Sequence, residues 1–125
     1  MYKHKNNLKL SDIKVQSDND GIFEEEIKVD YMIFEGLDKF KKIFKNDSAI
    51  NVLNQLKVPF GIVIINSLRL VSSERKRILT IKKIFGSNYF FVASAFTLNS
   101  DWRRFLKDNN INFISNFMQK LEENF

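Results

Sequence analysis

The sequence predicts an α/β protein with a small mixed sheet, mainly parallel, that starts with an antiparallel hairpin and has helices packed on it. Two observations favour this fold. Apolar runs of the length of buried strands occur at 60–65, 88–94 and 111–114, and a stretch with apolar residues at helical spacing follows each of them. Nearer the start, two alternating runs flank Asp18–Gly21, which is a strong turn signal.

The hairpin is expected to pair residues 8–15 with residues 22–29, because apolar and polar side chains alternate in both runs. After it, the strand period continues to Ile33 while a helical period begins in the same place. We therefore expect the first helix to start between Asp30 and Glu35.

A second helical segment is expected between residues 49 and 56, where the apolar residues share one face. Asp47 or Ser48 is expected to cap it and to interrupt a longer helix. The segment ends before Pro59, which cannot continue a helix.

Residues 60–86 carry the clearest pattern, because an apolar run turns into a basic amphipathic helix. The run is β-branched and predicts a strand buried on both faces of the sheet. Ser72 or Ser73 is expected to cap the helix that follows, and Gly86 is expected to end it in a left-handed conformation.

The carboxyl-terminal part repeats this arrangement. Asn99, Ser100 or Asp101 is expected to cap a helix in which Trp102 lies on the apolar face; core packing is favoured for this side chain over stacking on a base or a partner. A last strand precedes a final helix, whose inner face is expected to carry Phe117, Met118, Leu121 and Phe125.

Composition bounds the class of protein. At 125 residues and 44% hydrophobic content, the chain fits a single domain spanning 1–125, with residues 1–7 as a flexible tail. The 13 Phe residues are typical of an AT-rich bacterial genome rather than of an aromatic cluster. The chain has no Cys, no apolar leader behind its first charges and no run long enough to span a membrane, so we expect a cytoplasmic location.

The residues offer little to a catalytic or metal site. The one His, His4, excludes histidine triads and sites with several histidines, and no Cys is present to act as nucleophile or ligand. Glu24–Glu26 is more simply a solvated strand edge, and the four glycines form no phosphate-binding loop. We therefore expect neither an enzyme nor a cofactor. Any ligand is expected at the carboxyl ends of the strands, at Asn66–Ser67, Ser94–Ala95 and Ile114–Ser115.

The net charge of +5 has two interpretations. The basic helix at 73–85 is either a solvated face or a binding element for nucleic acid or an anionic membrane surface. In the second case the anion-binding residues are Arg75, Lys76, Lys82 and Lys83.

Ser72 and Ser73 also have two interpretations. Serines at a helix start are usually caps. A phosphate placed there would instead meet the helix N-terminus and the nearby Arg75 and Arg77, and would change the charge of an exposed corner of the sheet.

The segment FGIVIINSLRLVSSERKRILTIKKIFGSNYFFVAS resembles the central part of the STAS (SpoIIAA-like) family, and the resemblance covers about Ile22 to Phe125. Asn66 stands where the family has an acidic strand end. Val71 to Glu74 stands where it has Ile-Asp-Ser-Ser-Gly, so the Asp and the Gly are absent here.

The resemblance implies a non-enzymatic regulatory module that associates with a protein partner, a regulator or a kinase-like protein, through the loop and helix at 67–85. It implies Ser72 or Ser73 as a switch and a docking surface that contains Asn66, Ser67, Arg69, Arg75 and Arg77. A homodimer formed through the edge of the hairpin is a further expectation.

Overall fold

The sheet is mixed and its strands follow one another in chain order. The structure, a computed structural model, describes residues 8–10 and 29–123. Its five strands have the spatial order β1-β2-β3-β4-β5. β1 pairs antiparallel with β2, and β2 with β3, whereas the pairs β3–β4 and β4–β5 are parallel. The mixed α/β fold with an antiparallel start is therefore confirmed. The strands are β1 (Leu8–Leu10), β2 (Tyr31–Ile33), β3 (Phe60–Ile65), β4 (Phe90–Ser94) and β5 (Phe113–Ile114).

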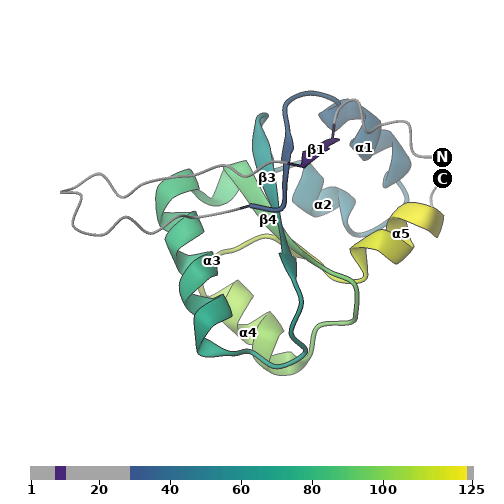
Figure 1. The fold of residues 1–125 in the computed structure, drawn as a ribbon. Helices are drawn as coiled ribbons and strands as arrows, with labels where there is room; N and C mark the ends of the chain where they lie inside the picture. Colours follow the sequence, from purple (N-terminus) through teal and green to yellow (C-terminus); the bar gives the residue numbers. More distant parts are fainter. Residues whose placement is uncertain (1–7, 11–28, 124–125) are drawn as a thin grey trace.

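Helices cover both faces of the sheet. Figure 1 shows α3 and α4 on one side, and α1, α2 and α5 on the other. The helices are α1 (Leu37–Ile43), α2 (Ile50–Leu53), α3 (Ser72–Phe85), α4 (Ser100–Asp108) and α5 (Phe117–Glu123), with a short 3-10 helix η2 (Ser87–Tyr89) before β4. The connections β3-α3-β4 and β4-α4-β5 therefore run over the same face.

Alternate residues of the central strands enter two separate cores. Val63 and Ile65 of β3 pack with the buried residues of α3 and α4, whereas Phe60 and Ile62 pack with those of α1, α2 and α5. The same alternation continues in β4. Because successive strand residues point to opposite faces, a strand between two helical layers needs an unbroken apolar run. The predicted strand at 60–65, buried on both faces, is confirmed.

The predicted start of the first helix between Asp30 and Glu35 is wrong, because α1 begins at Leu37. Residues 31–33 form β2 instead, and Ile33 lies opposite Phe60 of β3. Gly36 then turns the chain with φ of +96°, a conformation that glycine adopts without steric cost. Pairing with β3 thus outweighs the local helical period.

The hairpin differs from the predicted one in its second strand. β1 pairs with β2, and Leu8 lies opposite Ile33, so this strand lies beyond the predicted end at Val29. The predicted turn at 18–21, the run at 22–28 and the tail at 1–7 lie outside the described residues.

Asp47 holds the turn between α1 and α2, and a longer helix is interrupted there as predicted. The predicted cap at Asp47 or Ser48 is wrong, because Ala49 occupies the cap position of α2 and no side chain accepts a hydrogen bond there. The backbone N–H of Ala49 donates to Asp47 Oδ1 at 2.8 Å, and Lys120 Nζ of α5 lies 3.2 Å from the same oxygen. The hydrogen bond from Ala49 and the charge of Lys120 hold the pKa of Asp47 below its ordinary value of 3.8, against the opposing effect of burial.

In the carboxyl-terminal part, the cap of α4 is confirmed: Asn99 Oδ1 accepts a hydrogen bond from the backbone N–H of Trp102 at 2.9 Å. Trp102 is fully buried, as the core interpretation requires. The expectation for the last helix is wrong for Met118, which is 51% exposed, while Phe117 and Leu121 of α5 are buried. Phe125 lies outside the described residues. With 3.6 residues per turn, the buried pair at i and i+4 directs Met118 to solvent.

Candidate functional site

The loop from β3 to α3, residues 66–71, is fastened to α4 through its backbone. The indole N–H of Trp102 donates to the carbonyl oxygen of Ser67 at 3.1 Å, and the Asn99 side-chain amide donates to the carbonyl oxygen of Leu68 at 3.0 Å. Within the loop, the hydroxyl of Ser67 donates to the carbonyl oxygen of Arg69 at 3.0 Å. Both anchoring side chains belong to the start of α4, so the position of the loop depends on that helix.

This loop, which we call the docking loop, presents apolar side chains to solvent. Leu68 is 64% exposed, the highest value among the exposed large apolar residues of the described chain, and Val71 is 36% exposed. Asn66 and Arg69 are exposed beside them. Leu68 and Val71 thus expose apolar side chains on a loop whose backbone is held by hydrogen bonds from α4.

The predicted caps at Ser72 and Ser73 are wrong, because both residues lie inside α3. Val71 occupies the cap position in an extended conformation, and no side chain accepts a hydrogen bond there. A capping side chain must belong to the residue before the helix, since only from there does its oxygen reach the free N–H groups of the first turn. Both serines are exposed on the first turn.

The basic residues of α3 do not share one environment. The guanidinium of Arg75 lies 5.7 Å from the centre of the Phe105 ring on α4, and Lys82 Nζ donates to the carbonyl oxygen of Asn109 at the end of α4. Lys76 and Lys83 are exposed. The predicted anion-binding set is therefore divided between two residues that contact α4 and two that face solvent.

Arg77 lies on the opposite flank of α3, toward β2. Its guanidinium is 3.2 Å from Asp30 Oδ2 and 3.6 Å from Glu74 Oε1. Asp30 Oδ2 also accepts a hydrogen bond of 2.6 Å from the backbone N–H of Ile64 in β3. The arginine thus joins the helix to the sheet, away from the docking loop.

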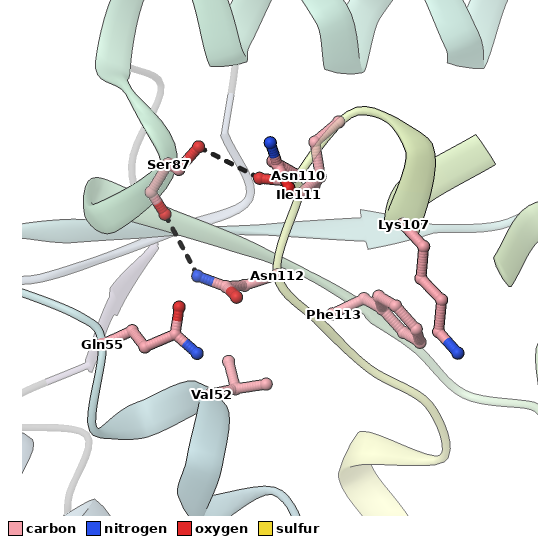
Figure 2. Close-up of a pocket in the computed structure, with 8 residues that line it drawn as sticks. All are labelled: Val52, Gln55, Ser87, Lys107, Asn110, Ile111, Asn112 and Phe113. Carbon is pink, nitrogen blue, oxygen red and sulfur yellow. Dashed lines mark hydrogen bonds between the residues drawn. The ribbon is translucent and has the colours of Figure 1, made fainter. Parts of the chain in front are cut away.

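A pocket lies at the opposite end of the sheet from the docking loop, at the amino ends of the parallel strands. It has a volume of about 560 Å³ and opens to solvent. Figure 2 shows its lining, which comes from the end of α2, from η2, from α4 and from the start of β5. The lining residues are Val52, Gln55, Ser87, Lys107, Asn110, Ile111, Asn112 and Phe113.

Two hydrogen bonds join the walls of this pocket. The hydroxyl of Ser87 donates to the carbonyl oxygen of Asn110 at 3.0 Å, and the side-chain amide of Asn112 donates to the carbonyl oxygen of Ser87 at 3.2 Å (Figure 2). Asn110 has φ of +56°, which asparagine tolerates better than most residues. The loop between α4 and β5 is thereby held against the segment that precedes β4.

The described residues bring together no group of three or more His, Cys, Asp or Glu side chains that could hold a metal ion. Among the same residues, no helix combines the length and apolar character that crossing a membrane requires. What the arrangement offers chemically is hydrogen bonding, apolar contact and positive charge.

Comparison of the chain with protein-family models, curated proteins and solved structures finds no match in any of the three. The relation to the STAS family stays a prediction.

The sequence drew attention to the carboxyl ends of the strands, and the docking loop begins there at Asn66. Sequence reasoning missed the pocket. Its polar residues lie at 55, 87, 107, 110 and 112, far apart in the chain, and only the clustered asparagines at 109, 110 and 112 stand out as a signal.

Proposed function

We propose that the protein is a non-enzymatic regulatory module of STAS-like type that binds a protein partner through the docking loop and the start of α3. The observation that carries this proposal is the 64% exposure of Leu68 on a backbone fastened by Trp102 and Asn99. We call the residues concerned the docking surface: Leu68, Arg69, Val71, Ser72, Ser73 and Arg75.

The chemistry of this surface specifies its partner. Leu68 and Val71 offer apolar contact, and Arg69 and Arg75 add positive charge beside them. The fitting partner is a protein that presents an apolar pocket rimmed by Asp or Glu, because such a rim complements the charge and the pocket buries the leucine. Arg77 has no part in this surface, since it faces Asp30.

The test is a pull-down with tagged protein from a lysate of the native host, washed at low and at high salt. We expect a protein partner that the wild type retains at high salt and that Leu68→Ser and Arg69→Glu lose. Once purified, the partner is expected to bind Leu68→Ser at least about tenfold more weakly, which corresponds to one lost apolar anchor of about 1.4 kcal/mol.

Met118→Ser is the matched control, because Met118 is also exposed but lies on α5, on the other face of the sheet. Equal recovery of the partner by wild type, Leu68→Ser and Met118→Ser would refute the docking surface. Circular dichroism of each variant shows that it is folded.

The serine switch belongs to the same proposal. Ser72 and Ser73 are exposed in the first turn of α3, where a phosphate gains from the helix dipole and lies one turn from Arg75 and Lys76. Ser73→Glu is expected to alter the affinity for the partner, while Ser72→Ala/Ser73→Ala retains the unmodified affinity. Unchanged binding by a folded Ser73→Glu variant would remove the switch and leave the docking surface in place.

One observation favours a second function, binding to nucleic acid or an anionic membrane surface. Besides Lys76 and Lys83 of α3, the residues Arg103, Arg104 and Lys107 of α4 are exposed, and the two helices cover the same face. Contacts between these cations and phosphates release counterions, so affinity falls steeply with salt. Recovery of only nucleic acid or lipid, lost in the high-salt wash, would favour this function over partner docking.

A further inference from the structure

The pocket lies at the amino ends of the strands, between the helices that cover one face of the sheet and those that cover the other. Val52 packs against the core formed with α1, α2 and α5, whereas Ile111 and Phe113 belong to the core formed with α3 and α4. Its volume of about 560 Å³ falls in the range of small-molecule sites. The docking loop lies at the opposite ends of the same strands, so the two surfaces are separate.

The walls of the pocket keep hydrogen-bonding groups available. Among the described residues, the side-chain amide of Asn112 donates to the Ser87 carbonyl and that of Gln55 donates to the Asn51 carbonyl, each through its nitrogen. Neither carboxamide oxygen accepts a hydrogen bond from a described residue. Each carboxamide therefore retains an acceptor and a second N–H donor, which is the pairing that matches a donor and acceptor side by side on a ligand.

Apolar and charged groups complete the lining. Figure 2 shows the Phe113 ring between the carboxamides of Gln55 and Asn112 on one side and the ammonium of Lys107 on the other. Phe113 is half-buried and Val52 lies on the same side as Gln55. Across the pocket, a neutral hydrogen-bonding end is thus followed by an aromatic surface and then by a positive charge.

We propose that this pocket binds a small anionic ligand with a planar ring that carries hydrogen-bond donors and acceptors, the chemistry of a purine nucleoside monophosphate. The carboxamides of Gln55 and Asn112 pair with the edge of the ring, as Asn and Gln pair with adenine in other settings. Phe113 contacts the ring face, and Lys107 pairs with the phosphate. This site needs neither the docking loop nor the partner.

The test uses the full chain labelled with ¹⁵N, titrated separately with adenosine 5′-monophosphate, adenosine and inorganic phosphate and followed by amide chemical shifts. We expect saturable binding of the nucleotide, with shifts concentrated at 52–55, 87–89 and 107–113. Gln55→Ala is expected to weaken it about fivefold to tenfold, as the loss of one hydrogen-bonded group would. Lys107→Ala is expected to weaken the nucleotide but to leave adenosine unchanged.

Matched controls come from exposed residues away from the pocket. Gln119→Ala on α5 and Lys45→Ala after α1 remove the same side-chain types and are expected to bind like the wild type. Any one of three results would overturn the proposal: shifts that rise linearly without saturation, equal affinity in Gln55→Ala and wild type, or phosphate bound as tightly as the nucleotide. The pull-down with Leu68→Ser reads a different surface, so either proposal can fail alone.

Discussion

The two ends of the sheet, where the parallel strands begin and where they finish, are built in opposite ways. At the carboxyl ends of β3 and β4, side chains from α4 hold the docking loop outward, and Leu68 reaches solvent. At the amino ends, the segments before β4 and β5 bind to one another through Ser87, Asn110 and Asn112 and leave a pocket beside α2. One end of the sheet therefore projects a surface, and the other end borders a pocket that is open to solvent.

The strand order explains why the pocket lies at the amino ends of the strands and not at the carboxyl ends, where ligands usually bind. In open α/β sheets, ligands meet the carboxyl ends of strands where the strand order reverses, because adjacent loops then diverge to opposite faces and leave a crevice. Here β3, β4 and β5 are neighbours in chain order, and both crossover helices cover the same face. Such a sheet has no reversal among its parallel strands, so the expectation of a ligand at the carboxyl ends lacks its geometric basis.

The largest expected effect on stability is at Trp102, where two variants compare packing with hydrogen bonding at the carboxyl ends of the strands. Trp102→Ala is expected to lower the free energy of unfolding by about 3–5 kcal/mol, because it removes a fully buried indole. Trp102→Phe keeps an aromatic ring but leaves the Ser67 carbonyl without its donor, and is expected to cost about 1–3 kcal/mol. Urea unfolding measures both. A Trp102→Phe variant as stable as the wild type would contradict a stabilising role for the hydrogen bond, and losses equal to those of Trp102→Ala would contradict the role of packing.

A smaller effect on stability is expected at Asp47, which belongs neither to the docking loop nor to the pocket and serves as a reference for both. Asp47→Asn is expected to lower the free energy of unfolding by about 1 kcal/mol at neutral pH, since the carboxylate accepts from Ala49 and pairs with Lys120. Because the pKa of Asp47 is lower in the folded chain, this stabilisation is fully present above its ordinary value of 3.8 and is lost as pH falls through the folded pKa. The measurement is urea unfolding of both proteins across acid and neutral pH. A wild-type advantage that stayed constant into acid would rule this account out.

The smallest effect on stability is expected at the pocket, at the amino ends of the strands. Ser87→Ala removes the hydroxyl that joins η2 to the Asn110 carbonyl, in an exposed position, and is expected to cost about 0.5 kcal/mol. Ser73→Ala is the matched control, because Ser73 is exposed and caps nothing; its stability is expected to change little. Thermal unfolding of the two variants gives the comparison. A loss at Ser73 larger than that at Ser87 would restore the capping role that the structure denies.

Much of the fold could be predicted because it depends on local patterns. The unbroken apolar run at 60–65 required burial on two faces, and Asn99 caps α4. Gly86 ends α3 as predicted and has a positive φ of 89°, but its ψ of 160° differs from the predicted left-handed helical conformation. Each of these features is set by residues within a few positions of one another.

What the sequence by itself determined is that the strands at 60–65 and 90–94 are apolar on both faces and that the helical segments after them are amphipathic. The tertiary structure decided where segments far apart in the chain meet. Residues 31–33 form a strand because β3 supplies a pairing partner. One pocket contains Gln55, Ser87 and Asn112 because the strand order places α2, η2 and β5 at the same end of the sheet. The physical reason is that side-chain periodicity is a property of neighbouring residues, whereas strand pairing and pocket geometry depend on contacts that no local pattern encodes.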